Sequence, residues 1–332
     1  MQATDALVEQ LREVERRREG REDRPIRILA VDGGGIRGLI PARVLAELED
    51  RTGRRMAECF DLIAGTSTGG IIAAALAVPE PGTDHPRWSA QTLVDLYTNR
   101  GGDIFHRPWW RALLEWMIAK YSPRGLDRIL ADKLGDATLR DAVTEVLLTS
   151  WDLSNDDPRY FSSVSDPDVP MRIAARATSA APTYFPPLWF GEPERRALVD
   201  GGVFANDPAR LAWMAKRSPG GDPALAPVLV SLGTGSAKSP DPSKRRFWGT
   251  LPWARPMIDL LLTAPSDLVE RELRDAADQR QLKYFRLNPR SLGAASPRLD
   301  DVSPENIRAL DAVATELIRT EQRQLDEIAA LL

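Results

Sequence analysis

Two segments of the sequence share a pattern that restricts the fold: a short apolar run, a glycine-rich turn, and then a helix-like stretch. The first leads from 26–31 through Asp32-Gly33-Gly34-Gly35-Ile36-Arg37-Gly38 into an amphipathic segment that ends near residue 50. The second leads from 60–64 through Gly65-Thr66-Ser67-Thr68-Gly69 into an alanine-rich apolar stretch at 71–78. Strands that alternate with helices indicate a mostly parallel sheet covered on both faces. The sequence therefore predicts an α/β chain.

The rest of the chain extends this pattern. We expect strands at 26–31, 61–64, 145–148, 197–199, 227–232 and 282–287, with helices between most of them. The expected architecture is a three-layer α/β/α fold with a mostly parallel central sheet. Residues 1–25 are expected to form a charged helical arm, and residues 26–332 one domain that ends in a helical region.

The last helix has a clear start signal. Ser303 is expected to cap a helix that begins with Pro304 and runs toward Leu332. Asp300 and Asp301 stand just before it. We interpret them as turn and capping residues rather than as metal ligands.

Ser67 is a candidate nucleophile because a G-x-S-x-G turn between a strand and a helix leaves its hydroxyl exposed above the helix N-terminus. A helix N-terminus favours developing negative charge. The chain has only two histidines, His85 and His106, and neither follows Asp200, so the chain order Ser, Asp, His is excluded. Two arrangements remain: a serine activated by a histidine that precedes Asp200 in the chain, or a serine activated directly by a carboxylate. Both histidines are interpreted as structural residues.

Asp200, in Asp200-Gly201-Gly202, is the candidate base. A carboxylate is a weak base for a serine hydroxyl, since its reference pKa is about 3.9. Desolvation would raise that pKa, and a hydrogen bond from Ser67 would align the carboxylate.

The loop Gly33–Gly38 can bind an anion, because consecutive glycines after a strand leave backbone N–H groups free to converge on one. The anion could be a dinucleotide pyrophosphate, since Gly33-x-Gly35-x-x-Gly38 matches the dinucleotide fingerprint. That reading needs an acid at the end of a second strand about 20 residues on. The acids near that distance lie in the preceding helix instead: Glu47, Glu49 and Asp50. The sequence therefore favours an oxyanion hole, with a dinucleotide-binding module as the alternative.

The composition narrows the partners and the compartment. Lysine and arginine total 44 against 48 acids, so the net charge of -4 gives no overall attraction to nucleic acid. Cys59 is the only cysteine, which excludes an internal disulfide and favours a reducing, cytoplasmic setting. No apolar run has the length of a membrane span. Any membrane contact is expected to be local and peripheral.

Tryptophan is the one aromatic residue with an informative distribution. The nine tryptophans include two clusters with basic neighbours, Trp109, Trp110 and Trp116 in one and Trp248 and Trp253 in the other. Such clusters suit either a membrane interface or a buried cap over the site.

Four ordered blocks together resemble the patatin-like phospholipases. They are Asp32–Gly38, Gly65–Gly69 with Gly70, the segment Ala177-Thr178-Ser179-Ala180-Ala181-Pro182-Thr183-Tyr184-Phe185-Pro186, and Asp200–Gly202. The resemblance implies a patatin-type fold and a Ser-Asp dyad of Ser67 and Asp200. It also implies an oxyanion hole of Gly33, Gly34 and Gly35 with Arg37 nearby, and motif glycines at Gly38, Gly65, Gly69, Gly201 and Gly202.

The implied activity is that of a lipid acyl hydrolase of phospholipase A type, which cleaves fatty-acyl esters of membrane phospholipids. The expected partner is a phospholipid or another acyl-ester lipid; neither a metal nor an organic cofactor is indicated, and no nucleic acid. Besides dinucleotide binding, two alternatives stay open: a catalytically inactive scaffold, and a signal-regulated membrane-degrading effector like some bacterial relatives. The sequence does not specify the oligomeric state.

Overall fold

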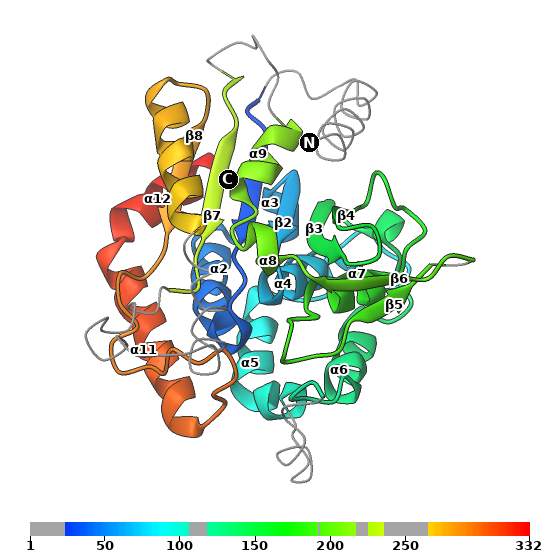
Figure 1. The fold of residues 1–332 in the computed structure, drawn as a ribbon. Helices are drawn as coiled ribbons and strands as arrows, with labels where there is room; N and C mark the ends of the chain where they lie inside the picture. Colours follow the sequence, from blue (N-terminus) through cyan, green and yellow to red (C-terminus); the bar gives the residue numbers. More distant parts are fainter. Residues whose placement is uncertain (1–23, 106–117, 192, 217–224, 236–264) are drawn as a thin grey trace, which may run out of the picture.

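The computed structural model describes residues 24–105, 118–191, 193–216, 225–235 and 265–332. Within these residues an eight-stranded sheet forms the centre of the molecule, as Figure 1 shows. Its strands are β1 (Arg27–Val31), β2 (Leu62–Gly65), β3 (Glu145–Asp152), β4 (Asp157–Ser162), β5 (Leu188–Phe190), β6 (Arg196–Asp200), β7 (Val228–Leu232) and β8 (Lys283–Leu287). The strand order is β5-β6-β3-β2-β1-β7-β8, and β4 pairs with β3.

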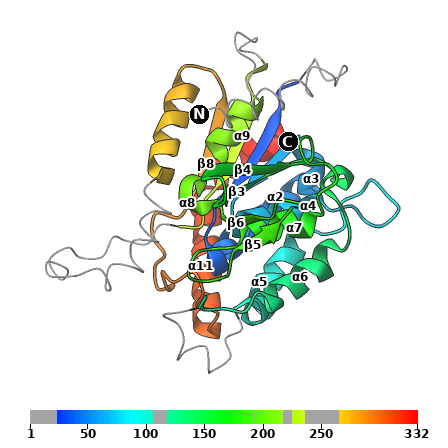
Figure 2. The same ribbon diagram turned by 45° about the vertical axis from the view of Figure 1, so that its right-hand side comes forward.

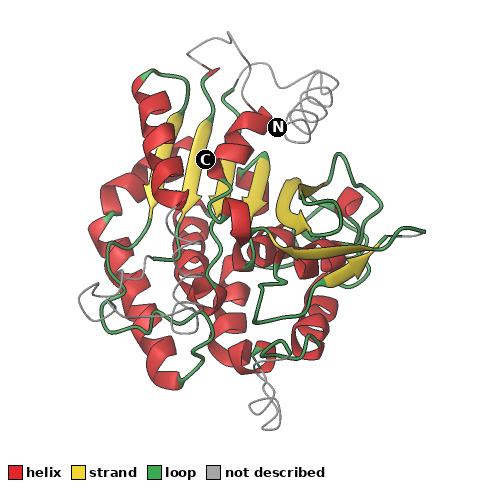
Figure 3. Cartoon of the chain, in the orientation of Figure 1, coloured by secondary structure: helices red, strands yellow, loops and turns green. Residues whose placement is uncertain are grey.

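The middle of the sheet is parallel, as predicted. Strands β3, β2, β1, β7 and β8 pair in parallel, and all six expected strands form. One edge differs from the expectation, because β4 and β6 pair antiparallel with β3, and β5 pairs antiparallel with β6. Strands β4 and β5 were not expected. Figure 3 shows this antiparallel edge reaching away from the parallel strands.

Strand β3 connects the two parts because it is longer than its neighbours. Its first half pairs with β2 and its last three residues pair with β6, while β4 runs along both halves. A strand has two hydrogen-bonding edges, so β2 and β6 must share the edge opposite β4. The two strands run toward each other along that edge.

Helices cover both faces of the sheet. They are α2 (Leu39–Thr52), α3 (Met56–Cys59), α4 (Thr68–Ala77), α5 (Ala90–Ile104), α6 (Arg124–Leu134), α7 (Met171–Thr178), α8 (Gly202–Ala205), α9 (Ala209–Lys216), α11 (Pro304–Thr320) and α12 (Gln322–Leu331), with short 3-10 helices η1 (Gly35–Gly38) and η3 (Leu139–Asp141). A further helical segment spans 265–278. Figure 2 shows α5 and α6 packed side by side, with α9 and 265–278 near the opposite end.

The core has two parts that follow from strand alternation. Side chains of successive strand residues point to opposite faces. In β1, Leu29 and Val31 join the large apolar cluster that contains α2, α4, α5 and α11, whereas Ile28 and Ala30 join the smaller cluster beneath α9 and 265–278. This is the three-layer α/β/α arrangement that the sequence predicted. Every residue of α4 is buried, between the sheet and neighbouring helices.

The C-terminal helix begins as predicted, since the Ser303 side chain accepts a hydrogen bond from the Asn306 N–H at 3.3 Å. It ends at Thr320, and α12 follows as a separate helix. Asp301 caps the same turn through Ser303. Asp300 lies in the turn before this helix, as expected, and its buried carboxylate also pairs with Lys120 and accepts a hydrogen bond from the Tyr121 hydroxyl at 2.7 Å.

Three expectations lie outside the described residues: the N-terminal arm up to residue 23, both tryptophan clusters, and His106. Within the described ranges, none of the helices combines the length and the apolar character needed to cross a membrane.

Candidate active site

Ser67 lies at the sharp turn between β2 and α4. Its φ of 55° is in the left-handed region, which non-glycine residues seldom adopt and which costs conformational energy. Only glycine fits two residues before Ser67 and two residues after it. A Cβ on Gly65 would stand 2.2 Å from the Gly69 carbonyl oxygen, and a Cβ on Gly69 would stand 2.1 Å from the Val31 carbonyl oxygen. The predicted role of these two glycines therefore has a steric cause.

Thr178 fixes the serine's backbone. The N–H of Ser67 donates a hydrogen bond of 2.9 Å to the Thr178 hydroxyl, at the end of α7. Because that N–H already has an acceptor, it is not free to bind a substrate oxygen. Thr178 stands in the third motif block but was not among the predicted site residues.

Asp200 ends β6 and is only 3% exposed. Burial raises the pKa of its carboxyl to about 7, against the opposing effect of hydrogen bonds from the Ser67 hydroxyl and the Gly202 N–H. The Gly202 bond measures 2.7 Å. A carboxylate with a pKa near neutrality can both accept and return a proton under physiological conditions.

The glycine loop presents two backbone donors to the site. The Gly33 N–H donates to the Asn206 carbonyl at 3.1 Å, so Gly33 anchors the loop and offers no free donor. Gly34 and Gly35 line the cavity beside Ser67, and their N–H groups have no acceptor among the described residues. Arg37 is buried but does not line this cavity. The geometry thus narrows the expected anion-binding loop to Gly34 and Gly35.

The remaining motif glycines permit close packing around the same turns. A Cβ on Gly38 would meet the Thr68 hydroxyl at 2.5 Å, and a Cβ on Gly201 would meet the Thr149 hydroxyl at 2.1 Å. Gly202 begins α8 and supplies the N–H that bonds Asp200.

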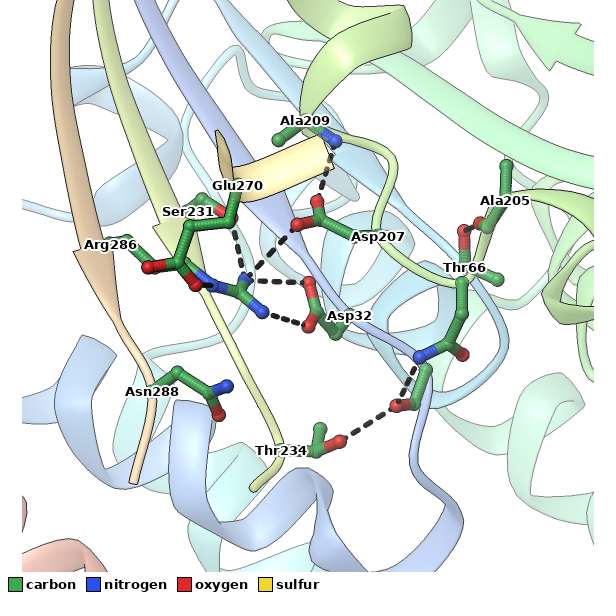
Figure 4. A network of polar contacts seen from close by, with 12 residues as sticks. Asp32, Thr66, Ala205, Asp207, Ala209, Ser231, Thr234, Glu270, Arg286 and Asn288 are labelled. Atoms are coloured by element: carbon green, nitrogen blue, oxygen red, sulfur yellow. Dashed lines mark hydrogen bonds and ion pairs between the residues drawn. The ribbon is translucent and has the colours of Figure 1, made fainter. Parts of the chain in front are cut away.

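A buried ionic network supports the glycine loop from behind (Figure 4). Arg286, on β8, holds both carboxylate oxygens of Asp32 at 2.9 and 2.6 Å and lies 3.5 Å from Asp207. Asp32 directly precedes Gly33, and Thr234 donates a 2.7 Å hydrogen bond to the Gly33 carbonyl. Burial raises the pKa of Asp32 to about 7, while the Arg286 guanidinium lowers it. The network fixes the loop to β7 and β8.

Sequence reasoning missed this network. Arg286 and Asp32 are 254 positions apart, and no motif surrounds Arg286. Asp207 and Asn206 follow the Asp200 block by only a few residues, so their nearness to a candidate base was the one available signal.

The cavity in front of Ser67 and Asp200 has a volume of about 210 Å³ and an almost entirely apolar wall. Its apolar side chains come from α4, α5, α6, α8 and the loops after α7 and before α11: Ile71, Tyr97, Ile104, Phe105, Leu126, Pro182, Tyr184, Phe185, Val203 and Leu299. Such a wall accepts a hydrocarbon chain and excludes water from the reacting groups.

Neither a histidine nor a metal cluster accompanies the pair in the part of the chain that the structure describes. The His85 side chain is 78% exposed in the loop between α4 and α5 and does not line the cavity. No three histidine, cysteine or acidic side chains of the described residues stand close enough to hold a metal ion.

Two comparisons with known proteins, one with a family model and one with curated relatives, point to one family. Residues 29–213 match the family model described as patatin-like phospholipase. Patatin-like protein 2 of Arabidopsis thaliana is 33% identical over 338 residues, which cover 89% of this chain and 83% of the relative. The probable inactive patatin-3-Kuras 1 of Solanum tuberosum is 32% identical, with coverage of 89% and 86%. Among solved structures, human GIVD cytosolic phospholipase A2 aligns with a TM-score of 0.48 and 11% identity, over 99% of this chain and 63% of that one.

Proposed function

Because this chain belongs to the patatin-like phospholipase family, we propose that it is a phospholipase A that cleaves fatty-acyl esters of membrane phospholipids with a Ser67-Asp200 dyad. Family membership supports lipid acyl hydrolase activity in general. The observation that carries the finer proposal is that Ser67 and the buried Asp200 line the same apolar cavity, where the Ser67 hydroxyl acts to lower the pKa of the Asp200 carboxyl.

In the proposed first step, the Ser67 hydroxyl oxygen attacks the ester carbonyl while Asp200 takes the hydroxyl proton. The negative charge that develops on the carbonyl oxygen is stabilised by the N–H groups of Gly34 and Gly35 and by the N-terminus of α4. Loss of one such donor typically costs about 3 kcal/mol of transition-state stabilisation. The intermediate then collapses, and Asp200 gives the proton to the departing alcohol oxygen. The acyl group remains bonded to the Ser67 oxygen.

In the second step, Asp200 removes a proton from a water molecule as that water attacks the acyl group. The tetrahedral intermediate collapses, and Ser67 leaves as a hydroxyl after it regains the proton from Asp200. The apolar cavity holds the acyl chain through both steps. Contact with the membrane is proposed to be peripheral.

The dinucleotide alternative has less support. It needs an acidic side chain at the end of the second strand to bind a ribose hydroxyl. Strand β2 ends at Gly65, whose close neighbour is the Gly69 backbone.

Activity must be tested directly, since the name of one relative includes the words "probable inactive". We expect a fluorophosphonate probe to label Ser67, as read by peptide mass spectrometry, and the purified protein to release fatty acids from mixed phospholipid vesicles. Ser67→Ala should lose both signals while its circular dichroism spectrum stays unchanged. His85→Ala and His106→Ala are the matched controls and should keep most of the activity.

Labelling of another serine together with full activity in Ser67→Ala would contradict the nucleophile assignment. Intact folding with no turnover on any lipid or short ester would favour the inactive scaffold. Turnover that begins only after a cell extract or small molecule is added would favour the signal-regulated effector.

A further inference from the structure

The apolar cavity is not the only apolar depression near Ser67. An open groove lies beside it, lined by Trp151 and Leu153 at the end of β3, by Val199 of β6, by Phe204 of α8 and by Pro187, among others. We call this depression the outer groove. Pro182, Phe185 and Val203 line both the cavity and the outer groove, so the two are separated by shared side chains rather than by a layer of protein.

The outer groove leaves large apolar side chains exposed to solvent. Leu153 is 52% exposed and Val203 is 40% exposed, although most large apolar side chains of the described residues are buried. Val203 stands three positions after Asp200, at the boundary between the cavity and the outer groove. An apolar surface that remains open next to a reaction centre indicates a ligand-binding surface.

The lining also defines the chemistry of the ligand. No charged side chain of the described residues lines the outer groove, and the polar groups of its side chains are the Thr183 hydroxyl and the Trp151 indole N–H. A phosphate or another charged head group would find no charged partner among these residues. The surface suits a hydrocarbon chain.

The wall between the two depressions is held in a strained shape. Thr183 is β-branched and has a φ of 72°, a conformation that is rare for such residues. Two backbone hydrogen bonds fix it: the Lys120 N–H donates to the Thr183 carbonyl at 2.9 Å, and the Tyr121 N–H donates to the Tyr184 carbonyl at 2.8 Å. Strain of this kind gathers at ligand-binding sites.

We propose that the outer groove binds the second hydrocarbon chain of a diacyl lipid while the chain that is cleaved occupies the cavity. The inference rests on the proposed function, and it specifies the substrate as a lipid with two chains. The two chains of a glycerolipid are attached to neighbouring glycerol carbons. A lipid whose ester carbonyl lies at Ser67 must therefore place its other chain close by. The outer groove is the apolar surface that continues from the cavity through Pro182, Phe185 and Val203.

The test uses glycerophosphocholines with one hexanoyl ester and one ether-linked chain, at concentrations below those at which they aggregate. Only the ester can be cleaved, so the cavity always receives the same acyl chain. The ether chain is methyl, butyl or hexyl, and both positional isomers are assayed. In the wild-type protein kcat/KM should rise with ether-chain length, by up to about fourfold for each fully buried methylene.

Leu153→Asp places a charge in the outer groove at an exposed position, so folding should not suffer. It should lower kcat/KM for the hexyl ether about tenfold, and leave the methyl ether and p-nitrophenyl hexanoate within about twofold of wild type. Leu268→Asp is the matched control, because Leu268 is 68% exposed on the helical segment 265–278 and lines neither the cavity nor the outer groove. It should change none of the three.

Each other result overturns the proposal. Equal values for all ether chains in the wild-type protein would show that the second chain is not bound. Equal losses of kcat/KM on all substrates in Leu153→Asp would assign Leu153 to the fold. A loss of activity on phospholipid vesicles without a loss on any of the soluble substrates would make the outer groove a membrane-docking surface. Absence of turnover by the wild-type protein on p-nitrophenyl hexanoate as well would instead defeat the proposed function, and this inference with it.

Discussion

Gly65 and Asp200 face each other along one edge of β3, where Gly65 pairs with Leu148 and Asp200 pairs with Ser150. The two residues end strands β2 and β6, which approach from opposite directions. The proposed nucleophile lies two residues beyond Gly65, so its distance from Asp200 is set by the register of two strands on a third. Groups held on strand ends keep their geometry better than groups on long loops.

The activity should depend on pH through Asp200. Burial raises the pKa of its carboxyl to about 7, and only the ionised form can accept the Ser67 proton. We therefore expect kcat/KM for a soluble short-chain ester to fall below neutral pH and to level off above it, with a midpoint near pH 7. Initial rates from about pH 5 to about pH 9 measure this midpoint.

The variant Asp200→Asn keeps the shape of the side chain and removes the base. Its rate should fall by about two to four orders of magnitude, and the residual rate should lose the midpoint near neutrality. A wild-type rate that stays constant down to about pH 5 would contradict the assignment of Asp200 as the base.

The same pKa makes a prediction about stability. The unfolded carboxyl has its ordinary pKa near 3.8 and the folded one a pKa near 7, so the folded state binds the proton more tightly. The free energy of unfolding therefore decreases as pH rises from the lower value through the higher one. Asp200→Asn removes this effect and should be more stable than the wild type at alkaline pH, by about 2–4 kcal/mol.

Urea unfolding of both proteins at about pH 5 and about pH 8.5 measures the difference. It should be largest at the higher pH and shrink on acidification. All other ionisable groups are common to the two proteins, so a difference that does not change with pH would show that Asp200 is not buried as a charge.

The sequence predicted the parts of the site that local physics determines. The Ser67 turn was recognisable because Gly65 and Gly69 are required by backbone contacts within and next to the turn itself. The parallel strands were recognisable because they are buried and apolar. Strand β4 begins with two charged residues, Asp157 and Arg159, on either side of Pro158, and β5 has only three residues, so neither carries a clear pattern.

Residues that act through long-range contacts were not predictable. Arg286 meets Asp32 only after β8 has paired with β7 and β7 with β1. Likewise, Gly33 was grouped with Gly34 and Gly35 because the three glycines look alike in sequence. The Asn206 carbonyl distinguishes them, and the sequence around Gly33 contains no sign of it.

Alanine substitutions of Gly35 and Gly53, which have similar φ angles, can distinguish the effect of a steric clash from that of backbone strain. Gly35 has a φ of 57°, and a Cβ there would lie 2.2 Å from the Leu299 carbonyl oxygen, whereas Gly53 has a φ of 66° and nothing within 4 Å. Gly53→Ala should cost about 1 kcal/mol of stability through backbone strain and keep full activity. Gly35→Ala should lose at least tenfold in kcat, because its N–H must shift from the position that the oxyanion needs.

Chemical unfolding and kcat on a soluble ester, measured for both variants, test this contrast. A Gly35→Ala protein with full kcat would remove Gly35 from the proposed oxyanion hole.

The last prediction concerns Arg286, which is buried with Asp32 and Asp207 and is the cation that pairs with both. Arg286→Met would leave these two carboxylates buried without their partner. Removal of one member of a buried ion pair typically costs about 3–5 kcal/mol. The loss should be greatest at alkaline pH and smaller in acid, because burial already raises the pKa of Asp32 to about 7 and protonation removes its charge.

Arg319→Met is the control, since Arg319 forms an exposed pair with Glu316 three residues earlier on α11. Its stability should stay close to that of the wild type and vary little between pH 6 and pH 9, roughly the range in which Asp32 titrates, because exposed ion pairs contribute little. Arg286→Lys keeps the charge but cannot hold both Asp32 oxygens in a fork. It should recover part of the stability and less of the kcat, because the ionic network would remain charged while the Asp32-Gly33 backbone lost its fixed orientation. Equal stabilities of Arg286→Met and the wild type across this range would show that the network does not hold the glycine loop.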